Sequence, residues 1–82
     1  MYYTYVLKCI DSETNRYIFY VGSTSDLKKR FLQHKNKNTN TTKKFDKIEL
    51  VYYEACQDKE KSLAREKYFK TGFGRRFLKD RI

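Results

Sequence analysis

Two segments near the N-terminus have the alternating pattern of paired β-strands. Residues 2–9, YYTYVLKC, place Tyr5 and the other odd-numbered side chains on one face, and residues 16–21, RYIFYV, resume the same aromatic and β-branched composition. The polar residues 11–15 between them have turn chemistry. The sequence therefore predicts an antiparallel hairpin whose second strand ends at Gly22.

A helix is predicted to follow over residues 26–37, with Ser25 or Thr24 as its N-cap. Four of its side chains share one face because they fall at positions i, i+3, i+4 and i+7; they are Leu27, Arg30, Phe31 and His34. An apolar face that also carries an arginine and a histidine is either an edge of the core or the wall of an active site.

Three further elements are predicted in the second half of the chain. Residues 48–55, IELVYYEA, have the near-continuous apolar character of a strand covered on both faces, which predicts a central position in the sheet. Asp58 is placed to cap a helix over residues 59–70, and Gly72 is placed to terminate it. Residues 73–81 are predicted to form a short last helix with three apolar residues facing the body of the protein: Phe73, Phe77 and Leu78.

These elements fit a single α/β (α+β) domain over residues 1–82, with the order β-β-α-β-α and a final helix. A three-stranded, mainly antiparallel sheet would pack against the helices. A chain of 82 residues buries only a small core, and aromatic residues, at 17%, must supply much of it. No stretch approaches the roughly 20 apolar residues that span a bilayer, and the N-terminus lacks the pattern of a signal peptide.

The charge of the chain indicates a polyanionic partner. The chain carries 19 lysines and arginines against 10 acidic residues, a net charge of +9, and nucleic acid is the commonest polyanion that so basic a domain binds. The alternative is solubility alone, or a codon bias towards lysine. The basic stretch at residues 35–44 is either a solvated linker or a phosphate-contacting arm. Cys9 and Cys56 lack disulfide or metal-site spacing, which indicates a reducing, cytoplasmic setting.

Glu66 is the candidate carboxylate for chemistry. On the second predicted helix it shares a stripe with Leu63 and Phe69, which are expected to face the core, so it needs a cationic partner, either Arg30 or a divalent metal. With His34 and the strand tyrosines, this set matches what phosphodiester hydrolysis requires: a cation for the pentacoordinate phosphorus, a base for the attacking water and a carboxylate for Mg²⁺. Each residue also has a structural interpretation, as an ion pair, a core-edge histidine or packed rings.

The order of these residues resembles the GIY-YIG nuclease family, in particular small stand-alone proteins similar to the N-terminal nuclease domain of the excinuclease. Residues 3–5, YTY, stand at the GIY position, and residues 20–22, YVG, stand at the YIG position. Arg30 stands ten residues after the first tyrosine of the second motif, His34 follows four residues later, and Glu66 lies on the next predicted helix. The resemblance covers nearly the whole chain, and the ordered set is more specific than any single residue.

The resemblance implies a role for each of these polar residues. Tyr5 would orient or activate the nucleophilic water, assisted by Tyr20 and by His34 as proton acceptor. Arg30 would clamp the scissile phosphate and stabilise its developing charge. Glu66 would hold a single Mg²⁺ or Mn²⁺ ion that assists the leaving oxygen.

The chain keeps most of the family pattern and departs from it at three places. Gly22 is kept, and the resemblance implies that it allows a tight turn from strand to helix. Tyr3 and Thr4 stand where the first motif has Gly and Ile, at positions that are mainly structural. The asparagine that many relatives carry after the metal-binding glutamate is missing, since no asparagine occurs beyond Asn40.

The expected function is a metal-dependent endonuclease that hydrolyses phosphodiester bonds in DNA, in repair, recombination or processing, with RNA left open as a substrate. Affinity would be largely electrostatic, with diffuse phosphate attraction from Lys28, Lys29, Arg75 and Arg76. A partner protein or a homodimer would supply target choice, and no membrane is involved. Two alternatives remain, namely a nucleic-acid-binding module that has lost cleavage, which the missing asparagine would allow, and a protein-interaction adaptor.

Overall fold

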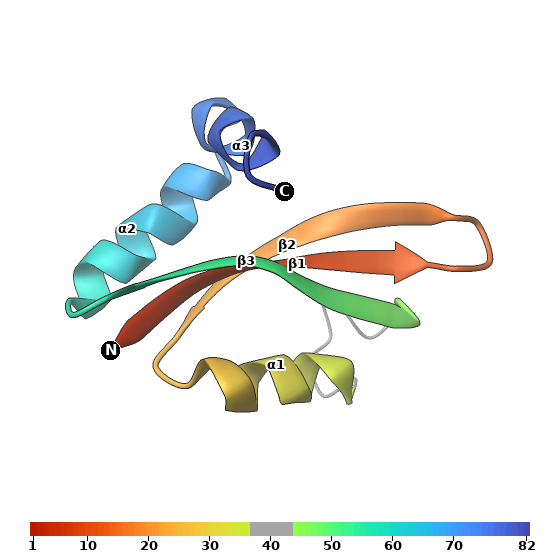
Figure 1. Ribbon diagram of the computed structural model, residues 1–82, viewed down its shortest axis with the longest axis horizontal. Coiled ribbons are helices and arrows are strands. Elements are labelled where there is room, and N and C mark those ends of the chain that lie inside the picture. Colours follow the sequence, from red (N-terminus) through yellow and green to blue (C-terminus); the bar gives the residue numbers. More distant parts are fainter. Residues whose placement is uncertain (37–43) are drawn as a thin grey trace.

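The computed structural model describes residues 1–36 and 44–82, so most of the predicted basic loop lies outside the described residues. In chain order the elements are β1 (Tyr2–Asp11), β2 (Arg16–Thr24), α1 (Leu27–Lys35), β3 (Lys47–Cys56), α2 (Lys59–Phe69) and α3 (Gly72–Lys79) (Figure 1). This order, with three strands in one antiparallel sheet, confirms the predicted α+β fold class.

The sheet has the strand order β2-β1-β3, and both neighbouring pairs are antiparallel. The predicted hairpin is confirmed, with Tyr5 of β1 opposite Gly22 of β2. The predicted central position of the third strand is wrong, because β1 is central and β3 is an edge strand. Helices cover both faces of the sheet, so an edge strand carries the same apolar run as a central one.

The sheet is the middle layer of three, and each of its faces has its own core (Figure 1). On one face, the cluster around Leu7 includes Phe31 of α1. On the other face, Val6 joins a cluster with Phe69 of α2 and Leu78 of α3. The alternation of side chains along β1 therefore separates α1 from the other two helices. Site residues carried by α1 and by α2 must approach the sheet from opposite sides.

The first two helices begin at aspartates. Asp26 is the N-cap of α1, in place of the predicted Ser25 or Thr24, and its carboxylate accepts a hydrogen bond from the Lys29 N–H at 3.1 Å. Asp58 caps α2 as predicted and accepts hydrogen bonds from the N–H groups of the first turn. A carboxylate at this position also interacts favourably with the positive end of the helix dipole.

The break between α2 and α3 is made by Thr71, and the prediction that Gly72 terminates α2 is wrong. Gly72 is the first residue of α3, and no glycine of the described residues has a positive φ. The Thr71 hydroxyl accepts a hydrogen bond from the Gly74 N–H at 3.1 Å, so a new helix starts directly after the first one ends. A Cβ at Gly74 would collide with the Tyr68 carbonyl, so glycine allows α3 to fold closely against the end of α2.

Two side chains that were predicted to face the core are exposed. Leu63 is 42% exposed, because α2 turns Ser62 and Phe69 towards the sheet instead. Phe73 of α3 is 71% exposed and lies under the Arg76 guanidinium, whereas the other two predicted contacts of that helix are buried or half-buried. Within the two described ranges, no helix has the length and apolar character needed to cross a membrane.

Candidate active site

Gly22 makes room for the tyrosine that lies at the centre of the site. Tyr5 and Gly22 are partners across β1 and β2, and a Cβ at Gly22 would collide with the hydroxyl and ring of Tyr5. The implied turn at Gly22 is wrong, because β2 continues to Thr24 and no glycine has a positive φ in the part of the chain that the structure describes. The missing side chain instead lets the Tyr5 ring lie against the edge strand.

Arg30 and His34 of α1 meet on the Tyr5 hydroxyl. Arg30 Nε donates a hydrogen bond to Tyr5 Oη at 3.4 Å, and Tyr5 Oη lies 3.0 Å from His34 Nε2. A guanidinium can only donate, so the hydroxyl accepts from Arg30. The direction of its hydrogen bond with His34 follows the histidine tautomer: with the imidazole proton on Nδ1, the hydroxyl donates to Nε2. The i, i+4 spacing predicted this pair on one helical face. The result is a chain of hydrogen bonds from Arg30 through Tyr5 to His34.

Burial and charge fix the protonation state of this chain. Tyr5 is 1% exposed and His34 is 0% exposed. Burial, and then the charge of Arg30, lower the pKa of His34 to about 4, so the imidazole is neutral at neutral pH. Burial raises the pKa of Tyr5, with the hydrogen bond from Arg30 acting in the opposite direction. At neutral pH a protonated tyrosine therefore faces a neutral histidine.

Tyr20 forms the open side of the same cluster. Its ring centroid lies 4.9 Å from that of His34 and 6.3 Å from that of Tyr5. Unlike those two residues it is only half-buried. The pKa of Arg30 is raised above its ordinary value, first by its hydrogen bond to Tyr5 and also by Tyr20, so both phenols lie at the guanidinium. Arg30 is itself half-buried, and its Nη1 donates to Gln33 Oε1 at 3.0 Å.

Glu66 approaches this cluster from the other face of the sheet. It lies on α2, and its carboxylate is among the groups that raise the pKa of Tyr5, after burial and Tyr20. The predicted alternative of an ion pair with Arg30 is not formed among the residues that the structure describes. Glu66 pairs instead with Lys70, one turn along the helix, with Nζ 3.0 Å from Oε2. The carboxylate is thus near the phenols and joined to an exposed lysine.

The four basic residues expected to attract phosphate form two pairs on opposite sides of the sheet. Lys28 and Lys29 are exposed on α1, where they line a shallow surface pocket. Arg75 and Arg76 are exposed on α3, across the sheet from α1 (Figure 1). Charges spread in this way give a diffuse field and no single phosphate cradle.

A comparison with protein families shows which family has this arrangement of residues. A family profile described as the GIY-YIG catalytic domain matches residues 1–79. The chain belongs to the GIY-YIG family. This is a nuclease family, so the resemblance found in the two tyrosine motifs is confirmed.

Curated relatives of this GIY-YIG chain carry names that do not state an activity. It is similar to a UPF0213 protein of Bacillus pumilus (strain SAFR-032), with 37% identity over 71 residues that cover 85% of this chain and 67% of the relative. A UPF0213 protein of Streptococcus pyogenes serotype M3 is 38% identical over 69 residues, covering 83% and 70% of the two chains. One of Limosilactobacillus reuteri is 36% identical over 72 residues, covering 84% and 70%. No solved structure matches.

GIY-YIG nucleases are generally dependent on a divalent metal. The side chains of this chain fit such an ion only if most of its ligands come from water and substrate. Within residues 1–36 and 44–82, no group of three or more histidines, cysteines and carboxylates could enclose an ion. Glu66 supplies one carboxylate, close enough to Tyr5 to raise the pKa of its phenol after burial and Tyr20. A single hard oxygen donor suits Mg²⁺ or Mn²⁺ that takes its remaining ligands from water and from substrate phosphate. We therefore expect the ion to bind with the substrate.

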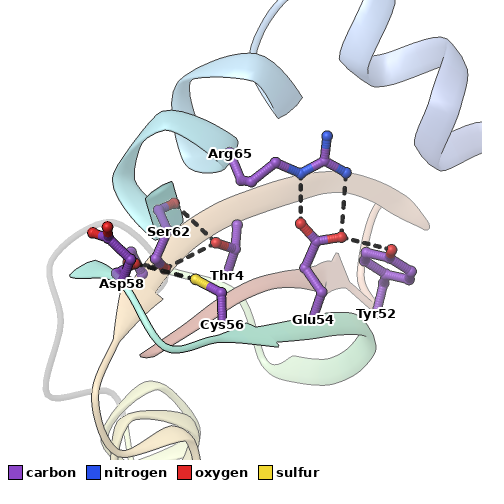
Figure 2. A network of polar contacts seen from close by, with 8 residues as sticks. Thr4, Tyr52, Glu54, Cys56, Asp58, Ser62 and Arg65 are labelled. Atoms are coloured by element: carbon purple, nitrogen blue, oxygen red, sulfur yellow. Dashed lines mark hydrogen bonds and ion pairs between the residues drawn. The ribbon is translucent and has the colours of Figure 1, made fainter. Parts of the chain in front are cut away.

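Sequence reasoning missed a group of hydroxyls beside the site. Thr4, Ser23 and Ser62 form hydrogen bonds between β1, β2 and α2. Figure 2 shows Thr4 and Ser62. Sequence reasoning also missed the ion pair between Arg65, which lies on the same helix as Ser62, and Glu54 of β3 (Figure 2). One signal was available for the first group, because Thr4 is a polar residue where the GIY motif has isoleucine.

Proposed function

We propose that this GIY-YIG chain is a divalent-metal-dependent endonuclease that hydrolyses phosphodiester bonds in DNA, with residues 1–82 acting as one domain. The observation that carries the proposal is the chain from Arg30 through Tyr5 to His34, in which a cation and a neutral base share one buried hydroxyl. A histidine with a purely structural role would gain nothing from a guanidinium two hydrogen bonds away, because the charge of Arg30 adds to burial in opposing protonation of the imidazole. A site that binds a phosphate and accepts a proton needs both the guanidinium and the neutral imidazole.

Arg30 is the residue that would bind the scissile phosphate. Its side chain is half-buried between two phenols, and one Nη group is turned towards Gln33, so the guanidinium has a fixed direction. A planar guanidinium matches the oxygens of a phosphate and stabilises charge that develops on them. A group held in place before the reaction needs no reorganisation when the charge appears.

Tyr5 and His34 would take the proton from the attacking water. As the water O–H bond breaks, a proton joins Tyr5 Oη, while the proton already on Tyr5 moves to His34 Nε2 along the 3.0 Å hydrogen bond. Tyr20, half-buried beside His34, would hold the water at the open side. A phosphate bound at Arg30 would offset the charge that lowers the pKa of His34. The histidine would thus become the stronger base when substrate is bound.

Glu66 would hold the metal ion, and the bound ion would supply positive charge to the leaving oxygen. The protein would place this carboxylate near Tyr5, whose pKa it raises after burial and Tyr20, from the face of the sheet opposite α1. The scissile phosphate would then lie between a fixed guanidinium on one side and Glu66 on the other.

Binding to DNA would be mainly electrostatic. The net charge of +9 gives a positive potential over much of the surface, and Lys28, Lys29, Arg75 and Arg76 would contribute diffuse attraction to phosphates. RNA carries the same phosphates, and a partner protein or a second copy would supply target choice. The two cysteines are free thiols, which fits a reducing, cytoplasmic setting.

The test is nicking of supercoiled plasmid with Mg²⁺, together with binding to a labelled duplex over a range of salt. We expect Glu66→Gln to lower the cleavage rate by about 100-fold or more while salt-sensitive binding persists. Arg30→Lys should cost about 10²- to 10³-fold, because a lysine lacks the fork that faces two phosphate oxygens. Glu60→Gln, an exposed glutamate at the start of the same helix, is the matched control and should cleave like the wild type.

Two results would contradict the proposal. A wild-type protein that binds DNA in a salt-sensitive way but does not cleave with Mg²⁺ or Mn²⁺ would be a binding module. A protein without salt-sensitive affinity for DNA or RNA would favour an adaptor that binds proteins.

A further inference from the structure

A buried group of three hydroxyls joins α2 to the sheet beside the candidate active site. Thr4 is 1% exposed and Ser62 is 0% exposed, and Ser23 of β2 completes the group. Thr4 Oγ1 lies 2.9 Å from the Ser62 carbonyl oxygen and 3.0 Å from Ser62 Oγ, which lies 2.8 Å from Ser23 Oγ. Figure 2 shows the side chains of Thr4 and Ser62 turned towards one another between the strand and the helix.

The direction of every hydrogen bond in this group follows from proton counting. Thr4 has one hydroxyl proton, and it is donated to the Ser62 carbonyl. Ser62 Oγ must therefore donate to Thr4 Oγ1, and its own proton is then used. Ser23 must donate to Ser62 Oγ. The bonds run from Ser23 through Ser62 to Thr4 and back to the backbone of α2, so loss of one hydroxyl disturbs the others.

Each hydroxyl lies next to a residue of the proposed site. Thr4 precedes Tyr5, Ser23 follows Gly22, and Ser62 lies four residues before Glu66. In an α-helix the N–H of residue 66 donates to the carbonyl of residue 62, which is the carbonyl that Thr4 also binds. The turn of α2 that carries Glu66 is therefore attached to β1 at the residue next to Tyr5.

We propose that Thr4, Ser23 and Ser62 are positioning residues that fix Glu66 relative to Tyr5 across the edge of β2. The proposal rests on the proposed function, in which Glu66 holds the divalent metal. The isoleucine of the GIY motif could not form these bonds. In this chain, hydrogen bonds between Thr4 and Ser62 therefore connect α2 to β1.

A second attachment of α2 separates positioning from folding. Arg65 pairs with Glu54 of β3 (Figure 2). Its guanidinium also lies over the ring of Phe69, 4.6 Å from the centroid. This attachment, together with burial of Phe69, holds the helix on the sheet from the β3 side. Loss of the hydroxyl group should leave α2 folded and docked, while the turn that carries Glu66 shifts.

The experiment compares Thr4→Val with Thr4→Ser. Valine has nearly the shape of threonine but lacks the hydroxyl, and serine keeps the hydroxyl but lacks the methyl group. We expect Thr4→Val and Ser62→Ala to raise the Mg²⁺ concentration for half-maximal cleavage about tenfold, with unchanged affinity for DNA. Thr4→Ser should restore a value near that of the wild type. Mn²⁺ binding to the complex with DNA, measured by electron paramagnetic resonance, should weaken by the same factor without depending on turnover.

Ile48→Val is the control for stability, because it removes a buried methylene from the other face of the sheet. It should lower the melting temperature and leave the Mg²⁺ requirement unchanged. If Thr4→Val does not fold, Ser23→Ala tests the same group from its half-buried end and should show a smaller shift in the same direction.

Two outcomes would overturn the proposal. If Thr4→Val lowers only the melting temperature, or if Thr4→Ser behaves like Thr4→Val, the hydroxyls are structural and the proposed function stands without them. If the wild type neither cleaves DNA nor binds Mn²⁺ in the complex, the proposed function fails and this inference fails with it.

Discussion

The two helices that supply the site residues hold them in opposite ways. On α1, Arg30 and His34 both bind the Tyr5 hydroxyl, so these side chains fix one another with no ligand present. On α2, Glu66 pairs with Lys70 and with no other side chain of residues 1–36 and 44–82; the Lys70 side chain is 55% exposed, and such a pair contributes little. The carboxylate owes its place to the attachments of the helix backbone, through Ser62 and Arg65.

The difference teaches how a small domain would divide the work of the proposed metal-assisted reaction. The half that would present a cation and a neutral base is held by hydrogen bonds on a buried hydroxyl before substrate arrives. The half that would receive an ion is half-buried and weakly paired, so an ion can replace the lysine. Preorganisation is thus concentrated where charge develops, and exchange is permitted where a ligand must come and go.

The largest effect is expected from filling the space beside Tyr5, because this disrupts the hydrogen bonds that Arg30 and His34 of α1 make to its hydroxyl. Gly22→Ala places a Cβ against the Tyr5 hydroxyl and ring, so we expect a loss of stability of about 1–3 kcal/mol and a large loss of cleavage. Gly72→Ala is the matched control, because no atom lies within 4 Å of its Cβ and its φ is not positive. Thermal melting and plasmid nicking measure both effects. Equal behaviour of the two variants would contradict the role assigned to Gly22.

A pH titration sharpens the comparison, because the α1 half holds His34, the single histidine of the chain, whose pKa changes on folding. The pKa of His34 is lowered to about 4 in the folded protein and is about 6.5 when unfolded, so the unfolded state binds the extra proton between these values. Stability from this group is complete above pH 6.5 and is lost as the pH falls towards 4. We expect the free energy of unfolding in urea to be about 2 kcal/mol lower at pH 5 than at pH 7.5.

His34→Phe should remove most of that dependence between pH 5 and 7.5. Glu54 also has a lowered pKa: burial acts to raise it, but its hydrogen bonds to Arg65 and Tyr52 outweigh burial. Its contribution is lost only at more acidic pH. An unchanged slope in the histidine variant would show that another group is responsible.

The smallest expected effect comes from freeing the Glu66 carboxylate of α2 from its ion pair with Lys70. Lys70→Met removes the ammonium that competes for Glu66, so we expect the Mg²⁺ requirement of cleavage to fall by about twofold, in line with the small free energy of such helix pairs. Lys67→Met, at another exposed lysine of α2, controls for the loss of one positive charge. An increase in the Mg²⁺ requirement would mean that Lys70 helps to place the carboxylate.

The sequence predicted those parts of the molecule that depend on local spacing. The hairpin, the capping role of Asp58 and the shared face of Arg30 and His34 all follow from patterns within about ten residues. The position of β3 was predicted wrongly, because strand order depends on pairing between distant segments.

The relation between the two halves of the site could not be predicted from local pattern. Whether Glu66 faces Arg30 or reaches Tyr5 around a strand depends on which face of the sheet each helix covers. The exposure of Leu63 was missed for a similar reason, since the bonds of Ser62 set the rotation of α2. A serine within a helix gives no sign of its partner 58 residues away in the sequence.

The location of Gly22 on an outer strand has a consequence for how so small a domain accommodates chemistry. Larger hydrolases open a cleft between two lobes, which takes more residues than this domain uses. In the proposed site the rim of a three-stranded sheet would serve instead, because the missing Cβ of Gly22 lets the Tyr5 ring lie against that rim. Such a rim is reached from outside without any hinge, so a long polymer can be engaged along its length and need not be threaded.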